Sequence, residues 1–133
     1  MTRPLHFAGY AALFGRADGS RDTIRPGAFE RSISERRSQL PLYWQHRPDQ
    51  QIGRVLEISE DAKGLRIIAA IDNPEGLAGK LLARREVDGL SFGYRARRFH
   101  HTIAGRVLED IDLHEISLVT HPLQHGARVH LIS

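Results

Sequence analysis

The sequence predicts an α+β fold, in the form of a small, mostly antiparallel β-barrel flanked by two helices. Several short segments alternate apolar and polar residues, as strands with one buried face do, and two segments carry apolar residues at helical spacing. A chain of 133 residues suffices for one hydrophobic core, so we expect residues 1–133 to form a single domain. With 41% hydrophobic and 26% charged residues, the composition is typical of a globular protein.

The first half of the chain predicts a strand, a helix and three further strands. Residues 5–14 are predicted to form an irregular strand, interrupted by Gly9. Pro26 suits the first turn of a helix over 26–37, on which Phe29 and Ile33 lie one turn apart. Strands are then expected at 40–46, 52–58 and 65–71, with a hairpin turn at 61–64 between the last two.

The second half predicts a helix followed by three strands. Leu77, Leu81 and Leu82 recur at helical spacing within residues 74–87, behind an Asn-Pro start signal. Alternation then indicates strands at 90–99, 107–111 and 113–120.

Composition and charge argue against several classes of protein. The chain has no cysteine, so it has neither disulfides nor thiolate metal sites, and it suits a reducing compartment. No window approaches the roughly 20 apolar residues of a membrane span, and the N-terminus lacks the apolar segment of a signal peptide, so we expect a cytoplasmic protein. The net charge is +3, but the arginine pairs at 36–37 and 84–85 lie near predicted helix ends, where cations complement the helix dipole. This favours a solvated surface over a nucleic-acid-binding groove.

Three segments carry the side chains of an activated serine. They are residues 43–46, 89–94 and 114–119, and they offer His46, Ser91 and Glu115 in that order. A histidine base, a serine nucleophile and a carboxylate are the three roles of a catalytic triad. The order differs from those of chymotrypsin, subtilisin and the α/β-hydrolases, so a triad here requires another scaffold.

Ser91 also lies within a Gly-x-Ser-x-Gly pattern, which marks the nucleophile elbow of α/β-hydrolases. An elbow follows a strand and precedes a helix, whereas here the predicted helix comes first and the strand follows. Within that strand Phe92 and Tyr94 share the apolar face, which places Ser91 on the opposite, polar face. The pattern therefore does not indicate an α/β-hydrolase.

Alternation places His46 and Glu115 among apolar neighbours. His46 has the parity of Leu42 and Trp44, where a lone histidine is most often a core residue. Glu115 has the parity of Leu113, and a buried carboxylate costs several kcal/mol unless it is paired. Its partner is therefore expected to be either an imidazole or one of the many arginines.

The eight histidines show no metal-binding pattern. No His-Glu-x-x-His is present, and Pro122 disfavours a continuous helix between His121 and His125. His100 and His101 are adjacent at a strand end, where neighbouring side chains diverge. We expect neither a metal ion nor an organic cofactor.

Six short motifs follow one another along nearly the whole chain. They are Phe7-x-Gly9-Tyr10 with Ala12 and Phe14; Asp22-Thr23-Ile24-Arg25-Pro26-Gly27-Ala28-Phe29; Leu42-Tyr43-Trp44-Gln45-His46 with Pro48; Ile52-Gly53-Arg54-Val55; Asp88-Gly89-Leu90-Ser91-Phe92-Gly93-Tyr94; and Glu115-Ile116-Ser117-Leu118-Val119 with Pro122. Together they resemble the prohead (capsid maturation) protease family of tailed phages. That family is similar, distantly, to the herpesvirus capsid protease assemblin, a small β-barrel wrapped by helices. The resemblance implies a single prohead protease domain with a herpesvirus-protease-like fold.

The resemblance also implies roles for the three candidate residues. It makes Ser91 the nucleophile and His46 its general base, and the third position falls on Glu115, where the herpesvirus relatives use a histidine. His114 and His121 are the alternatives for this third position. His114 is adjacent to Glu115 on one predicted strand, so the two side chains are expected to leave opposite faces.

The implied function is that of a serine endopeptidase in an immature capsid. It would cut the scaffold or the N-terminal scaffolding segment of the major capsid protein, and itself, with backbone N–H groups of residues 89–93 as candidate oxyanion donors. The implied partners are these proteins and the prohead shell, with self-association, but no membrane and no specific nucleic acid. The implied location is the assembling procapsid of a phage or a phage-like particle such as a gene transfer agent.

Two other classes of function stay open. The chain could be a catalytically inactive capsid-assembly or scaffold-binding factor of the same fold. It could also be a basic nucleic-acid-binding domain, given its excess of arginine.

Overall fold

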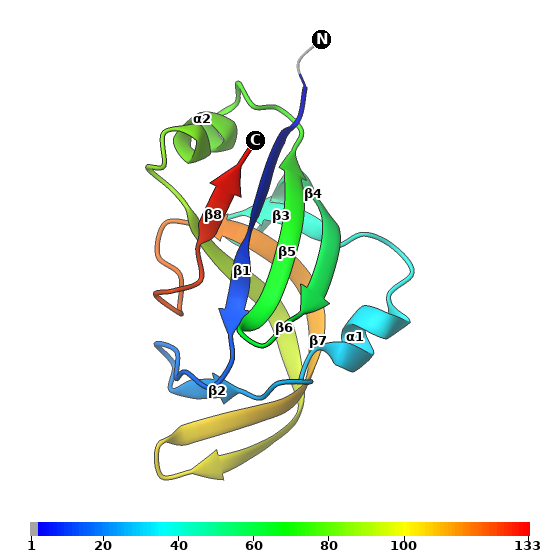
Figure 1. Cartoon of the computed structure of the whole chain (residues 1–133), viewed down its shortest axis with the longest axis vertical. Coiled ribbons are helices and arrows are strands. Elements are labelled where there is room, and N and C mark those ends of the chain that lie inside the picture. Colours follow the sequence, from blue (N-terminus) through cyan, green and yellow to red (C-terminus); the bar gives the residue numbers. More distant parts are fainter. Residues whose placement is uncertain (1–2) are drawn as a thin grey trace.

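The computed structural model describes residues 3–133, which form eight strands and two helices. The predicted α+β class with mostly antiparallel pairing is confirmed (Figure 1). In chain order the elements are β1 (Leu5–Leu13), β2 (Asp22–Ile24), α1 (Glu30–Glu35), β3 (Pro41–Trp44), β4 (Arg47–Glu60), β5 (Gly64–Ile71), α2 (Leu77–Ala83), β6 (Gly89–Thr102), β7 (Gly105–Val119) and β8 (Val129–Ile132).

Strand β7 organises the sheet, because three other strands pair with it. Strand β6 pairs with it antiparallel over most of its length, whereas β2 and β3 pair with it in parallel at two separate places. Between those two places, α1 and the turn before it accept hydrogen bonds from the backbone of β7. Ser32 Oγ accepts a hydrogen bond from Leu113 N–H (2.9 Å), and the Ala28 carbonyl accepts one from Ile111 N–H (3.0 Å). From β3 the sheet continues antiparallel through β4, β5 and β1 to β8.

The sheet curls into a barrel that does not close. Leu90 N–H donates to the Ala127 carbonyl (2.9 Å) and Val129 N–H to the Asp88 carbonyl (2.8 Å), which brings the starts of β6 and β8 together without a ladder between them. In Figure 1, β1, β5 and β4 stand side by side, with β6 and β7 crossing behind them. The far part of β6 and β7 extends as a long hairpin at the end opposite to α2 and both termini.

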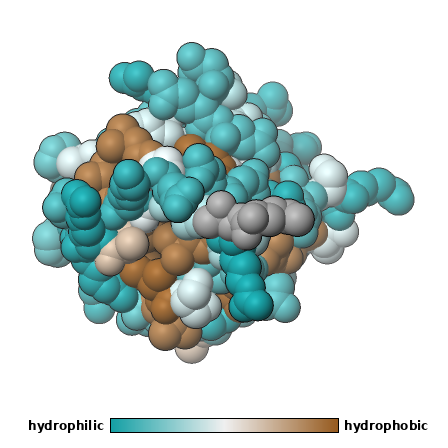
Figure 2. Space-filling view, turned by 90° about the horizontal axis from the view of Figure 1, so that it is seen from above, coloured by the Kyte–Doolittle hydropathy of each residue, from teal (hydrophilic) through white to brown (hydrophobic). Residues whose placement is uncertain are grey.

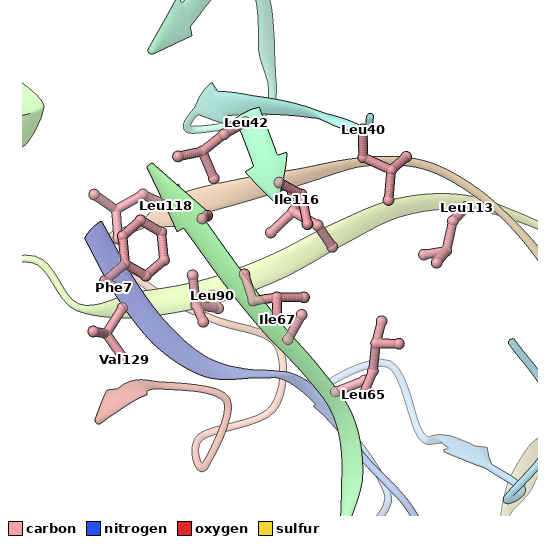
Figure 3. Close-up of a cluster of buried hydrophobic side chains, with 14 of the residues drawn as sticks. Phe7, Leu40, Leu42, Leu65, Ile67, Leu90, Leu113, Ile116, Leu118 and Val129 are labelled. Atoms are coloured by element: carbon pink, nitrogen blue, oxygen red, sulfur yellow. The ribbon is translucent and has the colours of Figure 1, made fainter. Parts of the chain in front are cut away.

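The core fills the space that the curled sheet encloses. Leu90 and Leu118, from β6 and β7, lie close to Phe7 of β1 and Ile67 of β5 (Figure 3), and all four are buried. Complete burial of each such side chain stabilises the fold by about 1.5–3 kcal/mol. Because side chains alternate along a strand, the residues between these core positions project from the outer face of β6 and β7.

Several predicted boundaries were wrong. Both helices are shorter than the predicted segments 26–37 and 74–87, and neither of them, within residues 3–133, has the length and apolarity needed to cross a membrane. The strands expected at 107–111 and 113–120 form the single strand β7. The short strands β2 and β8 went unpredicted because three or four residues are too few to establish alternation.

Candidate active site

His46 lies in the turn between β3 and β4, so its predicted place on the apolar face of a strand was wrong. Trp44 pairs with Arg47, which leaves Gln45 and His46 as a two-residue turn. Both have left-handed backbone conformations, with φ of 52° and 59°, as in a type I′ hairpin turn. Each such residue costs about 1–2 kcal/mol unless it is glycine. Gln-His carries no turn signal, because Asn, Asp and Gly are the residues that normally mark this turn.

Hydrogen bonds to β7 hold this turn in place. Gln45 N–H donates to the Leu118 carbonyl (3.0 Å). Thr120 N–H donates to Gln45 Oε1 (3.1 Å), and Gln45 Nε2 donates to the Thr120 hydroxyl. His46 N–H donates to Ser117 Oγ (3.1 Å). These bonds offset the conformational cost of the turn and fix His46 over the end of β7.

Glu115 is the partner of the His46 imidazole. His46 Nδ1 donates to Glu115 Oε1, and the Ser117 hydroxyl donates to Glu115 Oε2 (2.7 Å). Because an ionised carboxylate only accepts, a neutral His46 ring carries its proton on Nδ1 and keeps a lone pair on Nε2. The Glu115 side chain is 10% exposed, whereas the His46 side chain is 42% exposed. The ring is thus anchored in the protein at one nitrogen and half-exposed.

A β-bulge at His114 decides the face from which Glu115 projects. Gly93 pairs with Glu115, but the next residue, Tyr94, pairs with Leu113, which makes His114 an extra residue. The predicted shared face of Glu115 and Leu113 is therefore wrong, because Leu113 belongs to the core and Glu115 projects from the outer face. His114 is exposed, and among residues 3–133 its side chain hydrogen-bonds to no group of the site.

Ser91 lies on β6 directly opposite Ser117 of β7. Alternation turns both away from the buried Leu90 and towards the face that carries Glu115. Ser91 is 8% exposed, and in the described part of the chain its hydroxyl has no hydrogen bond to His46 or another protein group. Within residues 3–133 Ser91 Oγ has no protein partner, but it is not fully enclosed either, so it keeps contact with solvent.

Gly93 leaves the space that Glu115 occupies. A Cβ atom at this position would lie 2.9 Å from Cγ and Cδ of Glu115 and closer still to Oε1. The last glycine of the Gly-x-Ser-x-Gly pattern therefore makes room for a carboxylate on the neighbouring strand. Leu90 N–H is already bonded to Ala127, which leaves it unavailable as one of the expected oxyanion donors.

An apolar hollow of about 240 Å³ lies beside the hairpin that carries His46. Trp44, Ile52, Ile71 and Leu77 contribute to its walls, and Gln51 contributes a polar edge. Figure 2 shows apolar residues gathered on the end of the molecule that is seen from above, with polar residues around them. The hollow has the size and lining to hold an aliphatic or aromatic side chain.

Two further histidines, His121 and His100, make no hydrogen bond to this site in the part of the chain that the structure describes. His121 is exposed and, in the described residues, hydrogen-bonds to neither His46 nor Glu115. His100 pairs instead with Glu109 (2.8 Å) on the distal hairpin. No three His, Asp or Glu side chains within residues 3–133 gather in a way that could hold a metal ion.

A comparison with known protein families shows to which family the chain belongs. Residues 2–133 match the family described as Caudovirus prohead serine protease. The chain belongs to this family, and the resemblance predicted from the six motifs is confirmed. A search of the curated proteins finds no match.

Solved viral protease structures share the fold. The varicella-zoster virus protease matches with a TM-score of 0.65 and 18% identity, over 96% of this chain and 64% of that chain. The Kaposi's sarcoma-associated herpesvirus protease in complex with a hexapeptide phosphonate inhibitor gives 0.63 and 16%, over 98% and 65%. The bacteriophage T4 capsid assembly protease gives 0.66 and 12%, over 89% and 82%. The chain thus spans less than two thirds of the length of these herpesvirus proteases, and the predicted herpesvirus-protease-like fold is confirmed.

Proposed function

We propose that this protein is a serine endopeptidase that processes prohead components during capsid maturation. Its substrates are the scaffold protein or the N-terminal scaffolding segment of the major capsid protein, and its own chain. The observation that carries the proposal is the pairing of His46, in the β3–β4 turn, with Glu115 of β7, the strand whose next outward residue, Ser117, faces Ser91. Membership of the prohead serine protease family supports the reaction class.

In the proposed mechanism each side chain has one role. Ser91 Oγ attacks the scissile carbonyl carbon while His46 Nε2 accepts the hydroxyl proton. His46 then gives this proton to the leaving amine, and water repeats the sequence to release the acyl group from Ser91. Glu115 holds the ring through Nδ1 and stabilises the imidazolium that forms in each step.

Access to the site is consistent with this mechanism. The His46 ring is half-exposed, and Ser91 Oγ keeps contact with solvent. Catalytic hydrogen bonds are often long or unformed in substrate-free enzymes and tighten in the substrate complex. We therefore expect the Ser91 hydroxyl to turn towards His46 Nε2 when a peptide fills the site.

A substrate-independent probe tests the proposal. A fluorophosphonate forms a P–O bond with an activated serine and expels fluoride, so mass spectrometry should find the adduct on Ser91 of the intact chain. Ser91→Ala should abolish labelling while circular dichroism stays unchanged, and His46→Ala should slow labelling by orders of magnitude. Because nucleophile and base act as a unit, the double variant should be little worse than either single variant.

Co-expression with the scaffold and capsid proteins of the same particle tests the substrates. Mass spectrometry should find new termini in one of them, and these should vanish with Ser91→Ala. An unlabelled Ser91 together with uncleaved partners would overturn the proposal in favour of an inactive assembly factor.

A further inference from the structure

We infer that Ser117 is a positioning residue that locks His46 and Glu115 into one geometry. The inference rests on the proposed function, because it gives Ser117 a role in serving the base of Ser91. Ser117 lies at the centre of the site, opposite Ser91 on β6 and beside Tyr43 on β3.

The single proton of the Ser117 hydroxyl fixes the direction of its bonds. Ser117 donates to Glu115 Oε2 (2.7 Å), so its oxygen is free to accept the N–H of His46 (3.1 Å). The ring of the same histidine donates to the other carboxylate oxygen, Oε1. The four groups form a closed ring in which the backbone and the side chain of His46 are tied to the two oxygens of one carboxylate.

This closed set of hydrogen bonds explains how a histidine in a turn can be held in one orientation for catalysis. Ser117 is 0% exposed, so water cannot replace its hydroxyl without rearrangement of the site. Without this hydroxyl, the buried Glu115 Oε2 would lose a donor and the part-buried His46 N–H would lose its acceptor. The left-handed turn at Gln45 and His46 would lose one of its anchors, and the imidazole would no longer be confined to one orientation.

Ser117 acts through its neighbours and not on the substrate. Its side chain is fully buried and its proton is committed to Glu115, which makes it unsuited to attack a peptide. Ser91, which lies opposite and keeps contact with solvent, is the accessible serine of the pair.

The test is Ser117→Ala in the full chain, with two readouts. We expect kcat to fall about 10- to 100-fold with KM nearly unchanged, because the imidazole of His46 loses its fixed orientation while the bound peptide loses no contact. In proton NMR, the downfield signal of His46 Nδ1–H should broaden or vanish, because its carboxylate partner is no longer held. Ser117→Cys keeps the shape of the side chain but supplies a weak donor, and it should change both readouts in the same direction.

Ser32→Ala is the matched control. Ser32 is also buried and also accepts a backbone N–H, that of Leu113, but it lies on α1 and, among the described residues, makes no hydrogen bond to Ser91, His46 or Glu115. We expect a similar loss of stability with unchanged kcat and an unchanged His46 signal. Wild-type kcat and signal in both Ser117 variants would overturn the inference, as would equal effects of Ser32→Ala. The NMR comparison needs no activity, so it decides the role of Ser117 even where fluorophosphonate labelling has refuted the proposed function.

Discussion

At the residue scale, Gly93 matters because it has no side chain. Gly93→Ala would drive Cβ against the Glu115 carboxylate, and we expect kcat/KM to fall about 100-fold or more as the His46–Glu115 pair is displaced. The free energy of unfolding should fall by about 1–3 kcal/mol, as for other overpacked sites. A peptide-cleavage assay and urea unfolding measure the two effects separately.

Gly19→Ala is the control for this substitution. A Cβ atom there would meet the nearest atoms, both from Leu123, at 3.5 Å, which is ordinary van der Waals contact. Activity and stability should stay close to those of the unmodified protein. A Gly93→Ala variant with undiminished activity would show that Glu115 is not needed where it lies.

The sequence pointed to some residues of the candidate site and missed others for a physical reason. His46, Ser91 and Glu115 could be singled out because their side chains carry acid–base or nucleophilic chemistry. Ser117 and Gly93 carry no such mark. Their importance comes from the register between β6 and β7, which no local pattern encodes.

At the scale of the element, the bulge in β7 separates two adjacent residues. Glu115→Gln keeps the shape but removes the charge that stabilises an imidazolium, so we expect activity to fall by orders of magnitude, about 10⁴-fold in comparable triads. His114→Ala should leave activity nearly unchanged, because this side chain is exposed and the substitution keeps the extra residue that forms the bulge. Single-turnover cleavage by the two variants measures the difference.

The opposite pattern would change the assignment. A dead His114→Ala variant beside an active Glu115→Gln variant would move the third position of the proposed triad from Glu115 to His114. If both variants remain active, the site is a dyad of Ser91 and His46.

The longer strands were the more predictable elements. The strands β1, β5 and β6 lie close to the segments predicted at 5–14, 65–71 and 90–99. The turn at Gln45 and His46 was missed because it lacks Asn, Asp or Gly, and the bulge at His114 was missed because one extra residue leaves no signal in composition.

At the scale of the whole molecule, an ion pair between the buried Asp22 and the partly exposed Arg106 ties β2 to the β6–β7 hairpin. Arg106 donates two hydrogen bonds to Asp22 (2.9 and 2.8 Å), and the Tyr94 hydroxyl donates a third (3.3 Å). These bonds, chiefly those from Arg106, hold the pKa of Asp22 below its ordinary value. Folding therefore favours the charged carboxylate. This stabilisation is present above the unfolded pKa of about 3.9 and is lost as the pH falls through the lower folded pKa.

Asp22→Asn should lower the free energy of unfolding at pH 7 by about 1–3 kcal/mol, because the partly exposed Arg106 loses its charged partner. The same variant should lose less stability than the unmodified protein between about pH 5 and pH 2. Urea unfolding across this range measures both. Asp49→Asn, at an exposed position, should keep the original pH dependence, and an equal acid response in all three proteins would contradict the role of Asp22.

The parallel pairing of β3 with β7 has a consequence for the order in which the protein acquires its activity. His46 and Glu115 are 69 positions apart, and Ser91 lies between them in the chain. Of the three, His46 is synthesised first, Ser91 next and β7 last. His46 and Ser91 therefore exist for a time without the strand that orients them. On the proposed function, the growing polypeptide is inert towards its neighbours until β7 has been synthesised.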